Sequence, residues 1–152
     1  MVSELFNMST LRAIPLFAPL TPDELEQLRP AVQVVATGPG EVVVREGDSA
    51  DRLYCLVEGE VQVIKNYLEP GAQTVDILSP GDFFGEMALV GEDAKRSATV
   101  ITSEPSRFLT LDKEAFREVL LGHANIAYAV LVEAFRRLRQ ANDIIATIED
   151  AR

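Results

Sequence analysis

The sequence predicts a mainly β fold, an antiparallel β-roll or jelly-roll barrel with flanking helices. Short β-branched and apolar runs recur between residues 31 and 111 at a spacing of about ten residues, which is typical of this class. The 9 glycines and 8 prolines mostly separate these runs from one another. Helical patterns stand on both sides of them. With 152 residues, the chain is long enough for a single domain with a real core.

Two short helices are expected before the strands. The first covers residues 9–14 and ends at Pro15. The second begins with a capping box, in which Thr21 is the N-cap and Glu24 is the third helical residue, and proline occupies the first helical position. Pro30 stops this helix, because a proline cannot continue the hydrogen-bond ladder.

From residue 31 the apolar residues follow the period of a strand. Turns rich in glycine and proline separate the runs, and Gly59 lies in the tightest of these turns. The strands are expected at residues 32–35, 41–44, 53–57, 61–64, 74–78, 97–102 and 107–111.

Two helices are expected after the last strand. Asp112 is a good N-cap for a helix over residues 113–121, Gly122 breaks it, and a long helix follows from about residue 125 to 148. Its small and apolar residues form a heptad seam, which favours a two-fold dimer through this helix over burial of one wide face in the monomer. The seam consists of Ala124, Ala127, Leu131, Ala134, Leu138, Ala141, Ile145 and Ile148, and a second stripe of Tyr128, Val132 and Phe135 is expected to pack on the barrel.

The most informative stretch runs from Phe83 to Leu89 and is followed by Arg96 at the start of a β-branched run. A turn that opens a short helix leaves backbone N–H groups unpaired, and these suit an anionic oxygen. Arg96 adds a two-pronged donor that fits phosphate. Glu86 accepts hydrogen bonds only, which suits a pair of sugar hydroxyls. Together these residues predict a pocket for phosphate at one end and ribose at the other.

This stretch resembles the phosphate-binding cassette of the cyclic nucleotide-binding domain family. Residues 83–89 read FFGEMAL and residues 96–100 read RSATV, so every position of the family's pattern is met, and the linker has the length found in bacterial activators. The resemblance extends over residues 10–148. It implies a sensor for a cyclic nucleotide, with cAMP expected first and cGMP as the alternative, in which the helices after the β-roll move when the ligand binds.

The resemblance also assigns roles to individual residues. Arg96 pairs with the cyclic phosphate, assisted by Ser97 and the amide of Ala98, and Glu86 accepts from the ribose 2′-hydroxyl. The other expected ligand contacts are Gly85 at the same hydroxyl, the small Ala88 beside the phosphate, and Val63, Val75 and Met87 around the base, where a plain core role is the alternative.

At the base, the long helix departs from the family pattern. Ala141 and Asn142 stand where bacterial activators place hydroxyl side chains against adenine. Ala141 cannot form a side-chain hydrogen bond, whereas Asn142 can donate and accept. The preference between cAMP and cGMP therefore stays open at this point.

Composition argues against several other functions. The 14 basic and 24 acidic residues give a formal charge of −10 without a basic face for nucleic acid, and the cluster of Arg136, Arg137 and Arg139 is interpreted as a solvated helix face. His123 alone cannot form a cupin-type metal site, so no metal or cofactor is expected. Cys55, the single cysteine, fits a reducing cytoplasm. The apolar runs are too short to span a membrane, and neither a secretion signal nor an enzyme motif is recognisable.

The expected organisation has three parts: an N-terminal tail at 1–9, the nucleotide-binding β-roll at 10–122, and the long helix at 123–152, without a DNA-binding domain. The predicted function is a non-enzymatic cyclic-nucleotide sensor that forms a homodimer and acts on a downstream protein. Two alternatives remain. The chain could be the sensor half of a longer catabolite activator-type regulator, or a dimerisation scaffold that binds no nucleotide.

Overall fold

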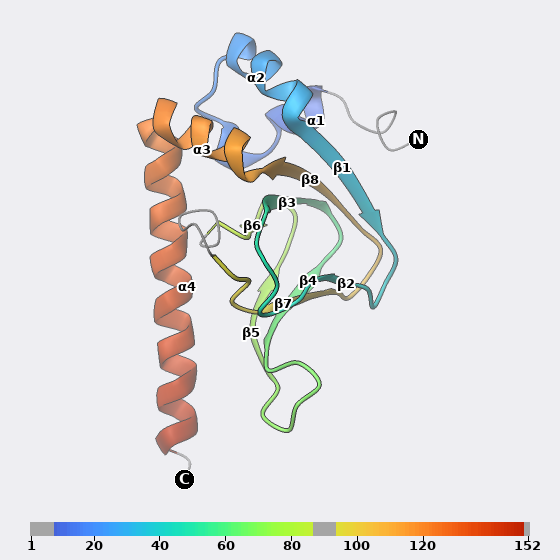
Figure 1. Cartoon of the computed structure of the whole chain (residues 1–152), viewed down its shortest axis with the longest axis vertical. Helices are drawn as coiled ribbons and strands as arrows, with labels where there is room; N and C mark the ends of the chain where they lie inside the picture. Colours follow the sequence, from blue (N-terminus) through green and yellow to red (C-terminus); the bar gives the residue numbers. More distant parts are fainter. Residues whose placement is uncertain (1–7, 87–93, 151–152) are drawn as a thin grey trace.

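The computed structural model describes residues 8–86 and 94–150. Figure 1 shows short helices at one end of the molecule, the strands in the centre, and one long helix along the side. The N-terminal elements are α1 (Met8–Arg12), the 3₁₀ turn η2 (Pro15–Phe17), α2 (Pro22–Leu28) and the 3₁₀ turn η3 (Arg29–Ala31). The predicted capping box is present, because the Thr21 hydroxyl accepts from the Glu24 amide at 3.2 Å and the Glu24 carboxylate accepts from the Thr21 amide at 2.9 Å.

The described strands form two antiparallel four-stranded sheets, with the orders β1-β8-β3-β6 and β2-β7-β4-β5. The predicted antiparallel β-roll is therefore confirmed, and its two sheets remain separate instead of closing into one barrel. The strands are β1 (Val32–Thr37), β2 (Val42–Val44), β3 (Arg52–Glu58), β4 (Val61–Lys65), β5 (Gln73–Leu78), β6 (Phe83–Phe84), β7 (Thr99–Thr102) and β8 (Ser106–Asp112).

The apolar core has two parts. One lies between the β1-β8-β3-β6 sheet and the helices, where Phe17, Phe116 and Ile126 are almost completely buried. The other lies between the two sheets and includes Phe84 and Phe108, whose rings meet edge to face with centroids 5.9 Å apart. Phe84 therefore anchors β6 between the sheets. It also fixes the position of the two residues that follow it.

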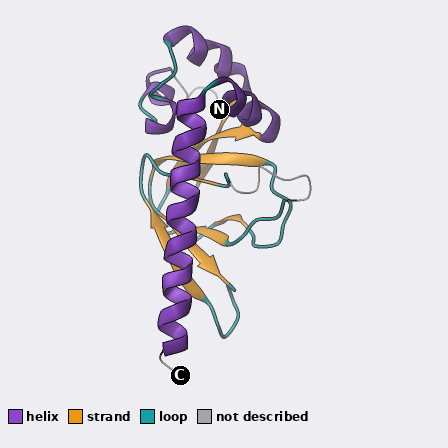
Figure 2. Cartoon of the chain, turned by 90° about the vertical axis from the view of Figure 1, so that its left-hand side faces the viewer, coloured by secondary structure: helices purple, strands orange, loops and turns teal. Residues whose placement is uncertain are grey.

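Two helices complete the chain: α3 (Lys113–Gly122) and α4 (Ala124–Asp150). Asp112 caps α3 as predicted, since its carboxylate accepts from the Ala115 amide at 2.8 Å. In Figure 2, α4 crosses in front of the strands and extends past them. No single helix of the described chain is long and apolar enough to cross a membrane; α3 and residues 124–140 reach that composition only jointly, across a bend of 114°.

The face that α4 turns toward the β-roll differs from the predicted one. Tyr128, Val132 and Phe135 were expected to pack on the roll, but they are 69%, 49% and 56% exposed. The inward face instead begins with the buried Ile126 and the half-buried Val130. It then continues in polar residues, because the part of the roll beside the middle of α4 presents carboxylates and a cavity instead of an apolar surface.

Candidate functional site

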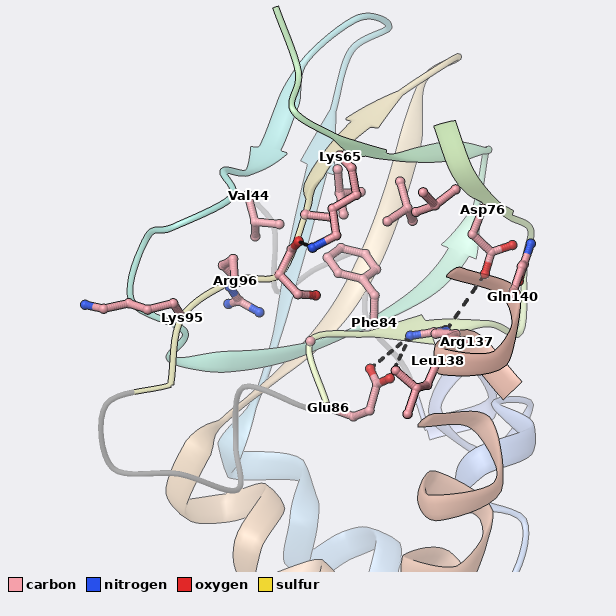
Figure 3. A pocket seen from close by; sticks show the side chains of 16 residues that line it. Val44, Lys65, Asp76, Phe84, Glu86, Lys95, Arg96, Arg137, Leu138 and Gln140 are labelled. Carbon is pink, nitrogen blue, oxygen red and sulfur yellow. Dashed lines mark hydrogen bonds and ion pairs between the residues drawn. The ribbon is translucent and has the colours of Figure 1, made fainter. Parts of the chain in front are cut away.

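A cavity of about 230 Å³ lies where the predicted site residues converge. Its walls come from β2, β4, β5 and β7, from the segments on either side of the undescribed residues 87–93, and from α4. Figure 3 shows three polar corners around Phe84: Arg96 on one side, Asp76 on the opposite side, and Glu86 below. This arrangement brings together residues that are far apart in the sequence.

Arg96 is the most unusual side chain at the cavity. It is only 6% exposed, its Nη2 atom lies 3.4 Å from the Asp51 carboxylate, and its guanidinium lies 5.6 Å from the centre of the Tyr54 ring. Its Nη1 atom is buried and has no hydrogen-bond acceptor among the described residues. Burial lowers the pKa of Arg96, because desolvation disfavours the charged form. A buried cation with an unused donor is suited to an anionic ligand.

Gly85 allows the backbone to approach this guanidinium. Its φ angle is +93°, a conformation that side-chain-bearing residues rarely adopt. A Cβ atom at this position would lie 2.5 Å from Arg96 Nη1 and 2.9 Å from the carbonyl oxygen of Arg52. Both distances are too short for a real contact. Glycine is therefore required here both by the backbone conformation and by the space.

Glu86 follows Gly85 and is 4% exposed. Both of its carboxylate oxygens accept from Nη1 of Arg137 on α4, each at 2.9 Å. Arg137 also donates through Nη2 to the carbonyl oxygen of Phe83, and its guanidinium lies 5.3 Å from the centre of the Phe83 ring. Arg137 therefore fastens the middle of α4 to the segment that carries Glu86.

The environment of Glu86 acts on its acidity in two directions. Desolvation raises the pKa of this carboxyl, and the positive charge of Arg137 opposes that rise. The net direction is upward. The positive charge of Arg137 on α4 thus favours the ionised, accepting form of Glu86 against the effect of burial.

A second arginine extends this contact. Arg136 donates to Asp76 on β5 at 3.1 Å, to Glu133 and to the side-chain oxygen of Gln140 at 3.0 Å. Glu133 also accepts from Arg137 Nε at 3.2 Å. Burial raises the pKa of Glu133, but the two arginines outweigh this effect and hold it below its usual value. Arg136 therefore pairs with Asp76, and Arg137 pairs with Glu86 and also lies 4.0 Å from Asp76.

The structure brings most of the predicted site residues together. Ser97 is exposed at the rim and Ala98 is buried, and the carbonyl oxygen of Ser97 accepts a hydrogen bond from Lys65. Asn142 is exposed on α4 and is not part of the cavity wall. Met87, Ala88 and the expected cassette helix lie outside the described residues. The predicted residues that line the cavity are Val63, Val75, Gly85, Glu86, Arg96, Ser97 and Ala98.

The predicted site did not include Arg137 of α4 or Asp76 of β5. The arginines at 136, 137 and 139 were predicted to form a solvated face, but Arg137 is half-buried against Glu86. A signal was available, because Arg137 stands seven residues after Val130 and therefore lies on the same face of the helix. For Asp76 the sequence contained no comparable signal, since strand alternation predicts that it faces away from Val75.

Known proteins resemble the chain over most of its length. It is 34% identical over 140 residues to a cAMP-dependent protein kinase regulatory subunit of Colletotrichum orbiculare, covering 92% of this chain and 32% of that protein. It is 29% identical to a cyclic AMP receptor protein of Thermus thermophilus, covering 87% of this chain and 61% of the other. The chain thus spans between about a third and three fifths of the length of these relatives.

Solved structures and a family model lead to the same group. The crystal structure of Thermus thermophilus catabolite activator protein superposes with a TM-score of 0.72 at 27% identity, covering 89% of this chain and 63% of that one. The sequence model of the cyclic nucleotide-binding domain matches residues 34–123, which include Glu86 and Arg96. This match covers more than half of the sequence. The chain therefore belongs to the cyclic nucleotide-binding domain family.

Proposed function

We propose that this chain binds a 3′,5′-cyclic nucleotide in the cavity beside Arg96, with cAMP as the first candidate and cGMP as the second. The observation that supports this most directly is the unused donor of Arg96, which is buried at the wall of the cavity beside Gly85. Family membership and relatives described as cAMP-dependent agree with it. A cyclic phosphate presents the negative charge that this donor needs.

The proposed orientation of the nucleotide follows from the three polar corners. The phosphate faces Arg96, with Ser97 and the amide of Ala98 as further donors. The ribose faces Glu86 and the backbone of Gly85. The base then extends toward the apolar wall formed by β4 and β5, with Val63 and Val75 as its expected contacts. Met87, Ala88 and Asn142 stay predicted contacts from the sequence.

Binding is proposed to change the position of α4. Arg137 donates to both oxygens of the carboxylate that the ribose would also use. A ribose hydroxyl must therefore either share Glu86 with Arg137 or displace it. We propose that α4 has one position in which Arg137 pairs with Glu86 and a second in which this pair is weakened or broken. A ligand that uses Glu86 favours the second position, and such a difference in affinity is the condition for a ligand to shift a conformational equilibrium. No catalytic step is needed for this role, so we propose a regulatory domain and not an enzyme.

Isothermal titration of the full chain with cAMP and cGMP tests the function. We expect saturable heat at one nucleotide per chain from at least one of them, and no heat from 5′-AMP, whose open phosphate has a different shape and charge. The absence of both heat and thermal stabilisation at millimolar cAMP and cGMP would favour the alternative of a scaffold that binds no nucleotide.

We further propose that α4 forms a homodimer. Leu131 and Leu138 of the predicted seam are 51% and 50% exposed, beside the exposed second stripe, and Leu138 also lies at the edge of the cavity. Apolar area of this kind on one helix is typical of an interaction surface. Sedimentation of the chain is expected to give a dimer, and Leu131→Glu with Leu138→Glu is expected to give a monomer. Leu68→Glu, at an exposed residue outside α4, should leave the dimer intact; an unchanged dimer in the double variant would contradict the proposal.

The output of the domain is also a proposal. The relatives that the chain matches are longer, and one is a receptor protein while another is a kinase regulatory subunit. We infer that α4 transmits the bound state to a further domain or a protein partner. Co-purification of a partner whose retention changes with the cyclic nucleotide would support this inference, and a nucleotide-independent partner would argue against it.

A further inference from the structure

Strand β5 presents two consecutive side chains, Val75 and Asp76, to the cavity. The β4–β5 ladder pairs Val63 with Asp76 and then Ile64 with Thr74, so Val75 is an extra residue on β5. In a regular strand, consecutive side chains point to opposite faces. Asp76 pairs with Val63, which lines the cavity, and lies two residues before the buried Leu78, so regular alternation turns Asp76 inward. The bulge brings the extra residue, Val75, to the same face.

Asp76 is therefore a carboxylate in the part of the cavity where the base is expected. Its side chain is 13% exposed. Its Oδ1 atom accepts from the backbone amide of Ile77 at 2.9 Å, and its Oδ2 atom accepts from Arg136 at 3.1 Å. An ionised carboxylate has about four acceptor positions, so these two hydrogen bonds leave capacity for a ligand.

The ion pair with Arg136 does not by itself explain why Asp76 faces the cavity. The Arg136 side chain is 48% exposed and also donates to Glu133 and Gln140, so it has partners without Asp76. Because the arginine of this pair is 48% exposed, solvent weakens its contribution to stability. A carboxylate that faces a cavity from its wall is more consistent with recognition of a ligand group that donates hydrogen bonds.

We propose that Asp76 reads the nucleobase by accepting a hydrogen bond from the exocyclic amine of an aminopurine. This inference rests on the proposed function. Arg96 and Asp76 lie on opposite sides of Phe84 (Figure 3), as the phosphate and base ends of one nucleotide require. Adenine offers its 6-amine, and guanine offers its 2-amine beside the N1 hydrogen. A base without an amine leaves the carboxylate without this donor.

Two matched pairs of ligands test the proposal on the full chain by titration calorimetry. The first pair is cAMP and the 3′,5′-cyclic phosphate of purine riboside, which lacks the 6-amine. The second pair is cGMP and cIMP, which lacks the 2-amine. We expect the amine to strengthen binding about tenfold in one pair, because hydrogen bonds to charged groups are among the stronger ones. The pair that shows this ratio identifies the base that Asp76 reads.

The protein variants then assign the effect to Asp76. Asp76→Ala is expected to reduce the tenfold ratio to about one. Arg136→Ala should retain it, because this variant keeps the Asp76 carboxylate, with Arg137 Nε 4.0 Å away. If the alanine variant does not fold, Asp76→Asn takes its place. It preserves the size of the side chain and keeps one acceptor, so it should give an intermediate ratio.

Three results would overturn the inference, and they differ from one another. Equal affinities within both pairs for the wild-type chain would show that no amine is read. A ratio that persists in Asp76→Ala or in Asp76→Asn at full size would assign the effect to another residue. The absence of heat from both cAMP and cGMP would instead refute the proposed function itself, and the base reading with it.

Discussion

Replacing Arg96 by alanine is expected to abolish measurable cyclic-nucleotide binding in a calorimetric titration. The variant would leave a phosphate in a largely buried site without its cation, and loss of one partner from such a pair costs about 2–5 kcal/mol. This corresponds to a loss of affinity of about thirtyfold to several thousandfold. The wild-type titration with the same nucleotide gives the reference.

The fold should tolerate this change, so the effect on binding can be measured. The partner of Arg96, Asp51, has a side chain that is 74% exposed and stays hydrated when the arginine is removed. The neighbouring Lys95 is exposed, so Lys95→Ala removes the same formal charge at the same mouth of the cavity. We expect that control to bind within a few-fold of the wild type. Equal losses in both variants would mean that overall charge, and not the buried guanidinium, attracts the ligand.

Replacing Arg137 by methionine is expected to destabilise the ligand-free chain by about 3 kcal/mol at pH 7.5. Glu86 is 4% exposed, and the variant would leave its charge buried without a partner. Removal of one member of a buried ion pair typically costs this much. Urea unfolding measures the change. Arg139→Met is the control, because Arg139 lies exposed on the same helix.

The loss should depend on pH in a definite direction. Burial already raises the pKa of Glu86, and without Arg137 it rises further. A carboxyl with a raised pKa binds more protons in the folded state than in the unfolded state, so stability falls as the pH rises through this window. The Arg137→Met variant should therefore lose less stability at pH 5 than at pH 7.5. Adding Glu86→Gln should restore much of the loss, and a deficit that is the same at both pH values would contradict this account.

The parts of the fold that depend on local patterns could be predicted from the sequence. The caps at Thr21 and Asp112 involve residues within one helical turn, so their chemistry is independent of the rest of the chain. The strands follow from alternation and turn residues, although their register does not. Glu86 and Arg96 were found because both belong to a pattern with a fixed spacing. Their positions at the cavity agree with that prediction, while their contacts with a ligand stay predictions.

The contacts of α4 could not be predicted in the same way. Apolar periodicity ranks the faces of a helix by hydrophobicity, and on α4 this ranking favoured the stripe that includes Phe135. In the structure Arg137 points inward instead and pairs with Glu86. Leaving a buried carboxylate without a cation costs more free energy than leaving an apolar side chain exposed to solvent. Glu86 and Arg137 are 51 positions apart in the sequence, so only the folded chain shows that they are partners.

The sequence by itself determined the class of the fold, the family, and the two residues of opposite charge around which a ligand is expected. Only the tertiary structure decided which arginine supports Glu86 and that Asp76 faces the cavity. The physical reason is that the spacing of residues in the sequence determines local geometry. Strand register and helix docking depend instead on which distant groups form hydrogen bonds and ion pairs with one another. On β5 the extra residue Val75 lets two consecutive side chains, Val75 and Asp76, face the cavity, which alternation along the sequence does not predict.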